Sequence, residues 1–384
     1  MGELSYPQLA GKDGYVGHLN DRIVTLPQVL RDNGYHTYMT GKWHLGDEEE
    51  KLPSSKGFNE TFILAQGGGS HWADSKGVSP MSHMTYQRNG RVVENLPEDF
   101  YSTKNYTDSL ISFIDRNRED NNPFFGYLAY TAPHDPLHAP GEYIAKYKGM
   151  YDGGWENLQD VRLERLKELG IYDQDVSTFP GIPAVQDWDT LSDEEKAMFS
   201  RDMEVYAAMV DYMDMSIGRV FDYLKEVGEY DNTLIIFFSD NGANGVPPSA
   251  YPGNGDGKYI GSFDNSLENR GLPNSFIDMG AGWAQAASTP SRLFKSFTTQ
   301  GGIHSPCIIK TPGKMETAGQ VKNSFMQVSD LYPTILEVAD ATFPETYKEN
   351  QLYSPQETQE LHMHLGKPTL FTVLIMARVG NYLK

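Results

Sequence analysis

Short apolar runs alternate with longer amphipathic stretches along this sequence. Residues 124–130 and 233–239 are nearly continuous apolar runs, which are typical of strands buried on both faces of a sheet. Apolar positions at helical spacing predict a helix over residues 102–118. A serine followed by three acidic residues at 192–195 predicts the start of a long helix that ends near residue 226. This alternation predicts a mainly parallel sheet covered on both faces.

The first part of the chain predicts a helix over residues 26–33, which ends at Gly34, and then a short strand over residues 35–39. Residues 47–99 are rich in glycine, serine and polar side chains, and we expect them to form a long surface excursion without a core of their own. We expect a second excursion over residues 140–183.

Composition excludes several classes of protein. Hydrophobic residues make up 39% of the 384 residues and aromatic residues 12%, so a disordered or fibrous chain is excluded. The single cysteine, Cys307, excludes an intramolecular disulfide framework and a cysteine-based zinc cluster.

The formal net charge of −20 repels phosphate backbones and anionic lipids, and so argues against nucleic-acid and membrane partners. An anionic small molecule would need a local cationic pocket. The sequence shows no signal peptide and no transmembrane segment, and it does not indicate a compartment.

Polar side chains that could carry chemistry follow the predicted strands. Asp240 and Asn241 directly follow the strand at 233–239, where ligands of parallel sheets bind, and their oxygens suit a hard cation such as Ca²⁺. The alternative is an ordinary Asn-Gly turn.

Lys42 and His44 lie two positions apart, so on an extended segment they leave the same face and could hold an oxyanion and move a proton. His134 follows another apolar strand in a proline-restricted loop. Taken alone, such residues are more often a surface lysine and packed structural histidines than members of a catalytic site. Lys295 is undecided by spacing alone.

The order of these segments resembles the type I sulfatases, most closely the bacterial-type arylsulfatases. The sequence Gly-Lys-Trp-His-Leu-Gly at residues 41–46 is similar to a signature of that family. The segments Ala-Pro-His at 132–134 and Asp-Asn-Gly at 240–242, and Lys295 with Gly-Gly-Ile at 301–303, follow in the family's order.

The resemblance implies a function for each of these side chains. It implies that Asp240 and Asn241 bind one Ca²⁺ ion and that Lys42 and Lys295 bind the sulfate oxygens. It also implies that His44 assists release of sulfate from the covalent intermediate and that His134 lies at the leaving-group oxygen. A cation with two lysines suits sulfuryl transfer, which spreads negative charge over nonbridging oxygens.

The resemblance breaks upstream of Lys42. Family members carry two adjacent aspartates on their first strand, and a Cys or Ser in a (Cys/Ser)-x-Pro-x-Arg segment that is oxidised to formylglycine. Neither feature lies among the residues before Lys42. The short pattern recurs at Ser288 to Arg292, in the wrong place for the family, and we interpret it as a decoy.

We therefore expect an α/β, alkaline-phosphatase-like sandwich with a mostly parallel central sheet that lacks its first strand. Residues 1–340 would form a catalytic domain incomplete at its N-terminus. Residues 341–384 would be a poorly matching remnant of a C-terminal subdomain.

The implied activity is hydrolysis of a small-molecule sulfate ester, with a formylglycine-generating enzyme as partner of the complete protein. We expect residues 1–384 alone to be inactive. The alternatives are a phosphoester or phosphonate hydrolase of the same superfamily, and a non-catalytic fragment that keeps an anion pocket. Residues 66–72 and the loop after Asn241 are candidates to line the leaving-group side of the site.

Overall fold

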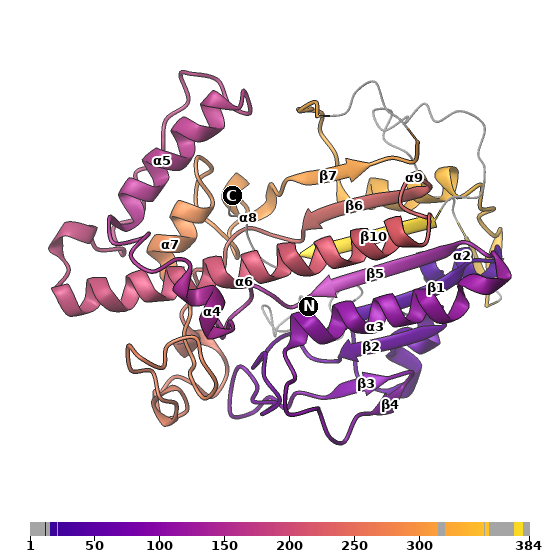
Figure 1. Ribbon diagram of the computed structural model, residues 1–384, viewed down its shortest axis with the longest axis horizontal. Coiled ribbons are helices and arrows are strands. Elements are labelled where there is room, and N and C mark those ends of the chain that lie inside the picture. Colours follow the sequence, from indigo (N-terminus) through magenta and orange to yellow (C-terminus); the bar gives the residue numbers. More distant parts are fainter. Residues whose placement is uncertain are drawn as a thin grey trace.

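An eight-stranded mixed sheet forms the centre of the computed structural model, which describes residues 12, 16–20, 22–313, 319–348, 350–352 and 372–378. The strand order is β4-β3-β2-β1-β5-β10-β6-β7 (Figure 1). In sequence order, these strands are β1 (His36–Lys42), β2 (Glu60–Leu64), β3 (Tyr86–Arg88), β4 (Arg91–Val92), β5 (Phe124–Tyr130), β6 (Thr233–Ser239), β7 (Cys307–Lys310) and β10 (Thr372–Arg378). A separate two-stranded sheet pairs β8 (Thr346–Tyr347) with β9 (Asn350–Gln351).

The inner strands of the sheet are parallel. β2 pairs with β1, β1 with β5, β5 with β10 and β10 with β6, all in parallel. β3, β4 and β7 are antiparallel additions at the two edges. The prediction of a mostly parallel sheet is therefore confirmed.

The position between β5 and β6 is occupied by β10, which pairs with both neighbours along its length. A sheet that lacks a strand would leave backbone groups of the neighbouring strands without partners. In the described part of the chain, the backbones of β5 and β6 instead pair with a strand from residues 372–378. The boundary proposed near residue 340 stays a prediction, although this strand beyond it belongs to the main sheet.

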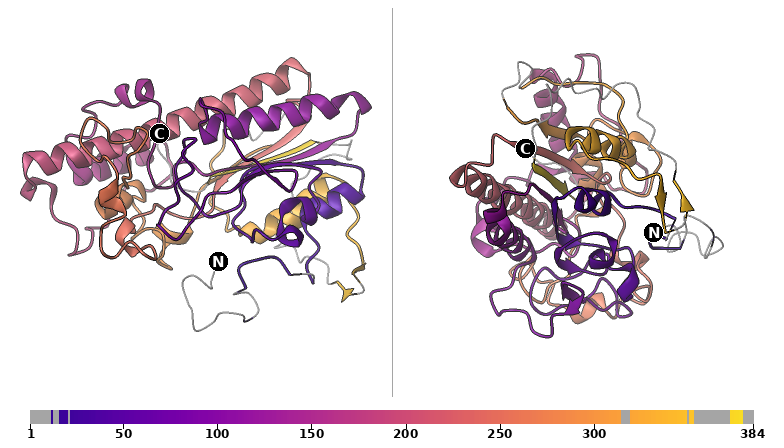
Figure 2. Two further views of the ribbon diagram at one scale, coloured as in Figure 1. Left: turned by 90° about the horizontal axis from the view of Figure 1, so that it is seen from below. Right: turned by 90° about the vertical axis from the view of Figure 1, so that its right-hand side faces the viewer.

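Helices cover both faces of the sheet, as Figure 2 (left) shows. α3 (Ser102–Asn117) and the long α6 (Asp193–Glu226) lie on one face, and α2 (Leu26–Asp32) and α9 (Leu331–Val338) lie on the other. Each face has its own buried core. Tyr106, Leu110, Phe113 and the C-terminal half of α6 pack on one side, and Val29, Leu30, Ile335 and Leu336 pack on the other.

The long helix α6 begins and ends where the sequence predicts. The side chain of Ser192 accepts a hydrogen bond from the backbone N–H of Glu195, and the Glu195 carboxylate accepts one from the Ser192 N–H. This capping box satisfies backbone donors that the first turn of a helix leaves unpaired.

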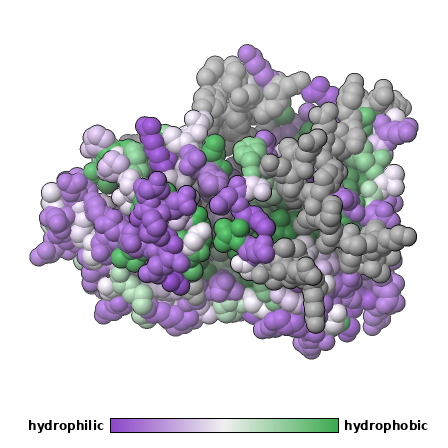
Figure 3. Space-filling view, turned by 90° about the horizontal axis from the view of Figure 1, so that it is seen from above, coloured by the Kyte–Doolittle hydropathy of each residue, from purple (hydrophilic) through white to green (hydrophobic). Residues whose placement is uncertain are grey.

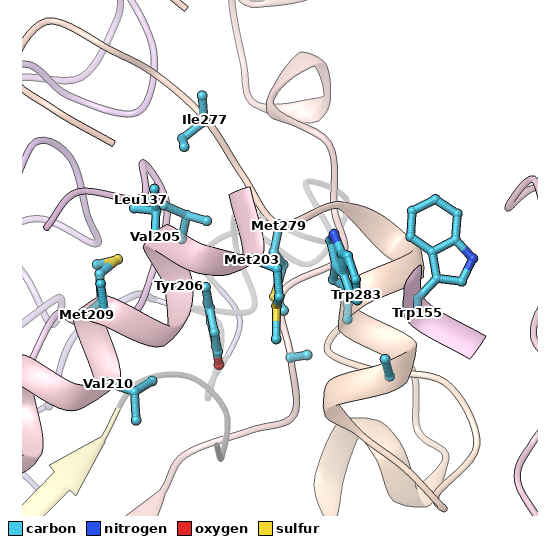
Figure 4. Packing of buried hydrophobic residues seen from close by; sticks show 14 of the residues in the cluster. Leu137, Trp155, Met203, Val205, Tyr206, Met209, Val210, Ile277, Met279 and Trp283 are labelled. Atoms are coloured by element: carbon cyan, nitrogen blue, oxygen red, sulfur yellow. The ribbon is translucent and has the colours of Figure 1, made fainter. Parts of the chain in front are cut away.

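The N-terminal half of α6 extends beyond the sheet and carries a third core, drawn in Figure 4. α4 (Gly141–Ala145), α5 (Gly154–Glu168) and α7 (Gly280–Ala287) surround it. Trp155 and Trp283 meet edge to face, with ring centroids 5.6 Å apart. Residues 140–183 were expected to be an excursion, but Trp155 and Leu163 of α5 are buried in this core.

The expectation for residues 47–99 is also wrong in part, because they contain β2. Phe62, Ile63 and Leu64 are buried, and β2 pairs in register with β1. Its short apolar run is buried because it pairs with β1 and packs against α3. The surrounding glycines and serines gave no local pattern that predicts a strand here.

Hydrophilic side chains are concentrated at one end of the surface (Figure 3). Hydrophilic side chains cover much of the outer surface at the end of the molecule where α5 lies (Figure 3). Among the described residues, no helix combines the length and apolar character needed to cross a bilayer.

Candidate functional site

Side chains from three parallel strands meet at one edge of the sheet. Lys42 is the last residue of β1, Asp240 directly follows β6, and His134 lies in the loop that leaves β5. Because carboxyl ends of parallel strands share one edge, this placement follows from the sheet itself. Lys295 joins them from the loop between α7 and α8 (Gln300–Ile303), where its backbone N–H donates to the Ala243 carbonyl at 2.8 Å.

Lys42 and His44 are held by a close approach of β1 to β5. Gly41 has a φ of 113°, and a Cβ at this position would lie 1.9 Å from the Ala129 carbonyl oxygen. Only glycine fits. His44 also has a positive φ, 55°, and its backbone N–H donates to the Ala65 carbonyl at 3.0 Å. The signature segment is therefore a strand end followed by a sharp, hydrogen-bonded bend.

His134 is buried, and both of its ring nitrogens have partners. Nδ1 lies 2.8 Å from the Asp135 carbonyl oxygen, and Nε2 lies 3.3 Å from Nζ of Lys295. A carbonyl oxygen only accepts and a lysine ammonium only donates. Nδ1 therefore carries the proton, and Nε2 is the unprotonated nitrogen that faces Lys295.

The two lysines share one electrostatic environment. The pKa of Lys42 is lowered to about 8, mainly by burial and also by repulsion from Lys295. Asp240 and Asp135 oppose this shift. Two neighbouring cations that partly lose their water favour an anionic ligand. The two lysines thus form the local group of cations that an anionic small molecule would need on a chain with a net charge of −20.

Both histidines of the site are neutral near pH 7. Burial lowers the pKa of His44 to about 4, and Lys42 and Lys295 lower it as well. Burial also lowers the pKa of His134 to about 3, with Asp135 opposing the effect and the lysines adding to it. Each of these shifts reflects a neighbouring charge, so Lys42, His44, His134, Lys295 and Asp240 lie close together in one site.

Asp240 and Asn241 offer oxygen atoms at the end of β6. Burial raises the pKa of the Asp240 carboxyl, although Lys42 and Lys295 act in the opposite direction. The amide nitrogen of Asn241 donates to the Gly242 carbonyl at 2.9 Å, which leaves its side-chain oxygen as the atom for a cation.

The donor set for a metal is small. Among the described residues, no group of three or more His, Cys, Asp or Glu side chains is arranged to hold a metal ion. Ca²⁺ takes about 6 to 8 oxygen ligands. Asp240 and Asn241 therefore have the right chemistry for Ca²⁺ but do not complete its shell.

The loop after β6 contacts the Gly-Gly-Ile segment directly. The backbone N–H of Gly242 donates to the Gly302 carbonyl at 3.0 Å, and the Gly301 N–H donates to the Arg292 carbonyl at 3.0 Å. Backbone hydrogen bonds thus connect the segment at 301–303 both to the loop after β6 and to the segment at 288–292.

Ser288 lies at the C-terminal end of α7, where its backbone N–H donates to the Ala284 carbonyl at 3.1 Å. Its hydroxyl is buried and has no hydrogen-bond partner. Its interpretation as a decoy stays a prediction.

Two glycines of the loop at 66–72 press against the site histidines. A Cβ on Gly67 would lie 2.5 Å from Cε1 of His44, and one on Gly68 would lie 3.3 Å from Nδ1 of His134. The sequence indicated this loop only as a lining of the leaving-group side.

Sequence reasoning missed three further residues of the site. Asp135, Asn244 and Tyr251 form a hydrogen-bonded cluster behind His134. The available signal was an acidic residue next to His134. Asn244 and Tyr251 lie in the loop after Asn241, which the sequence indicated only as a lining of the leaving-group side. No local pattern pairs either of them with Asp135.

Comparison with known proteins agrees with these features. The sulfatase family profile matches residues 5–341. An uncharacterized sulfatase of Schizosaccharomyces pombe is 46% identical over 87% of this chain and 61% of its own length. An arylsulfatase of Klebsiella aerogenes is 38% identical over 87% of this chain and 71% of its own length. The chain thus spans about three fifths to seven tenths of these two relatives.

The fold also matches a solved structure. The crystal structure of Ps i-CgsB in complex with k-i-k-neocarrahexaose superposes with a TM-score of 0.55 at 24% identity, over 85% of this chain and 56% of that one. The likeness supports the alkaline-phosphatase-like architecture.

Proposed function

The chain belongs to the sulfatase family, and from this premise we propose that its site serves the hydrolysis of small-molecule sulfate esters of the arylsulfatase kind. The observation that carries the proposal is the pairing of two partly desolvated lysines, Lys42 and Lys295, beside two neutral histidines. This arrangement suits an ester with a compact anionic head and a leaving group that needs a proton.

Each side chain has a separate task in this proposal. Lys42 and Lys295 bind nonbridging sulfate oxygens, where negative charge develops as the sulfur–oxygen bond breaks. Nε2 of His134 faces the leaving oxygen, and His44 exchanges a proton as sulfate departs.

Ca²⁺ and formylglycine belong to the activity that the resemblance to the sulfatases implies. Asp240 and Asn241 would contribute two of the ligands of Ca²⁺, which neutralises sulfate charge when bound. Ser288, within the short pattern at 288–292, has a buried hydroxyl, so it does not fit the role of a reactive nucleophile. We therefore propose that residues 1–384, assayed alone, bind sulfate without turning over an ester.

Activity on matched substrates tests the proposal. The protein encoded by the complete gene, coexpressed with a formylglycine-generating enzyme, should hydrolyse nitrophenyl sulfate faster than nitrophenyl phosphate. Much faster hydrolysis of the phosphate would contradict the sulfatase function and favour a phosphoester hydrolase. The variant Lys295→Met should lose the sulfate activity, and Lys258→Met, at an exposed lysine, is its control.

A further inference from the structure

The carboxylate of Asp135 is buried directly behind His134. Its side chain is 2% exposed, and Oδ1 lies 3.1 Å from Nδ1 of His134. Together with the Asp135 carbonyl at 2.8 Å, this oxygen gives the Nδ1 proton two acceptors. The acidic side chain thus lies on the ring edge opposite the one that faces Lys295.

Two neutral donors from a distant loop hold this carboxylate. Asn244 donates to Oδ1 through its amide nitrogen, and the Tyr251 hydroxyl donates to Oδ2 at 2.8 Å. Asn244 also donates to the Tyr251 oxygen at 3.2 Å. Because a buried polar group is costly unless it is hydrogen-bonded, the two donors satisfy both oxygens of Asp135 and fix its side chain in place.

This arrangement fixes the histidine ring in one tautomer. A ring whose Nδ1–H is held by a carboxylate presents Nε2 to the site, and the nearby negative charge favours the imidazolium when a proton is taken up. Asp135 raises the pKa of His134 against the effect of burial. A bound sulfate ester would add negative charge on the other side of the ring.

We propose that Asp135, held by Tyr251 and Asn244, is a positioning residue that orients His134 as the proton donor to the leaving oxygen. This inference rests on the proposed sulfate-ester hydrolysis. In the step concerned, the attacking oxygen bonds to sulfur, the bond between sulfur and the leaving oxygen breaks, and its electron pair stays on the leaving oxygen. His134, neutral in the free site, takes up a proton from solvent at Nε2 when the anionic ester is bound, gives this proton to the leaving oxygen and returns to the neutral form.

The role predicts a dependence on the leaving group. Esters of acidic phenols leave without a proton, whereas esters of weakly acidic phenols and alcohols need one. Removing the carboxylate should therefore reduce kcat for poor leaving groups by roughly 100-fold and leave good ones much less affected. A merely structural role would reduce kcat for all esters by the same factor.

Three variants of the active protein test this with a series of aryl sulfates of rising phenol pKa. We expect Asp135→Asn to steepen the dependence of kcat on phenol pKa and to leave the affinity for inorganic sulfate unchanged. Tyr251→Phe should act in the same direction with a smaller effect, because it removes only one donor to Asp135. It therefore also serves as the test if Asp135→Asn fails to fold. Tyr259→Phe is the matched control, because that hydroxyl donates to the Gly77 carbonyl instead.

A second readout does not depend on turnover. Nitrogen-15 NMR of the His134 imidazole should show only the Nδ1–H tautomer in the parent protein. In Asp135→Asn the amide that replaces the carboxylate can donate to Nδ1, so a share of the Nε2–H tautomer should appear although the Asp135 backbone carbonyl and Lys295 still favour Nδ1–H. If the parent hydrolyses no sulfate ester, the proposed function fails while the tautomer result still tests the positioning. The same single tautomer in the parent protein and in Asp135→Asn would overturn the role of Asp135. So would a loss of kcat in Asp135→Asn that is equal for every leaving group.

Discussion

The ammonium nitrogen of Lys295 lies 3.3 Å from Nε2 of His134. A cation next to an unprotonated imidazole nitrogen acts both as a hydrogen-bond donor and as an obstacle to protonation of the ring. The two residues are 161 positions apart in the sequence, yet Lys295 lowers the pKa of His134.

Lys295→Met should raise the pKa of His134, because Lys295 lowers it. The variant should also weaken sulfate binding by roughly 10- to 100-fold, the range expected for a lost hydrogen bond to a charged group. NMR titration of the His134 ring and calorimetry with sulfate measure the two effects. An unchanged or lower pKa of His134 would show that the pair is not electrostatically coupled.

Sulfate binding should weaken as the pH rises above about 8. The pKa of Lys42 is lowered to about 8, so its positive charge is present below this pH and lost above it. The affinity of residues 1–384 for sulfate should then fall by up to about tenfold per pH unit. Calorimetry at pH 7, 8 and 9 measures it. In Lys42→Met the affinity should be lower from the start and lack this step; the same step in the variant would assign it to another group.

Gly67→Ala should destabilise the protein by about 1 to 3 kcal/mol, the usual cost of overpacking. The added methyl group would lie 2.5 Å from Cε1 of His44, so the ring or the loop must move. Gly255→Ala is the control, because a Cβ there meets nothing within 4 Å. Urea unfolding of both variants gives the free energies. Equal values would mean that the loop at 66–72 is not packed on His44.

Calcium should bind residues 1–384 with a dissociation constant of roughly 1 mM, in the range of weak calcium sites. Asp240 and Asn241 supply few of the ligands that the ion needs. Asp240→Asn should weaken binding further, and calorimetry with CaCl₂ measures both. Micromolar binding that survives Asp240→Asn would place the metal elsewhere.

Ser288→Ala should leave sulfate-ester turnover by the complete protein unchanged. Its free energy of unfolding should stay the same or rise slightly, because the substitution removes a buried hydroxyl without a partner. Turnover and urea unfolding of variant and parent measure the two effects. Turnover by residues 1–384 alone that Ser288→Ala abolishes would instead make Ser288 the nucleophile.

The sequence predicts the parts of the site that depend on strand ends. Asp240 and Lys42 are recognisable because a predicted strand delivers each of them to the same edge of the sheet. The resemblance to the sulfatases then assigns a role to each of them. It is also the only basis for predicting Lys295, which no local pattern indicates.

What the sequence cannot predict depends on distant partners. Asp135 is visible next to His134, but its donors Asn244 and Tyr251 come from a loop after β6. In the same way, β2 is too short for its periodicity to distinguish it from a loop, and its burial depends on pairing with β1. Tertiary contacts decide these elements, and local patterns do not record them.

The place of β10 sets the order in which the sheet can form. β5 ends at Tyr130 and β10 begins at Thr372, yet β10 separates β5 from β6. During synthesis, β5 and β6 leave the ribosome long before the strand that belongs between them. They must stay apart, or separate again, to admit it. Closing so long a loop is entropically costly and slow. We therefore expect insertion of β10 to be a late, rate-limiting step, before which two strand edges remain open to wrong partners.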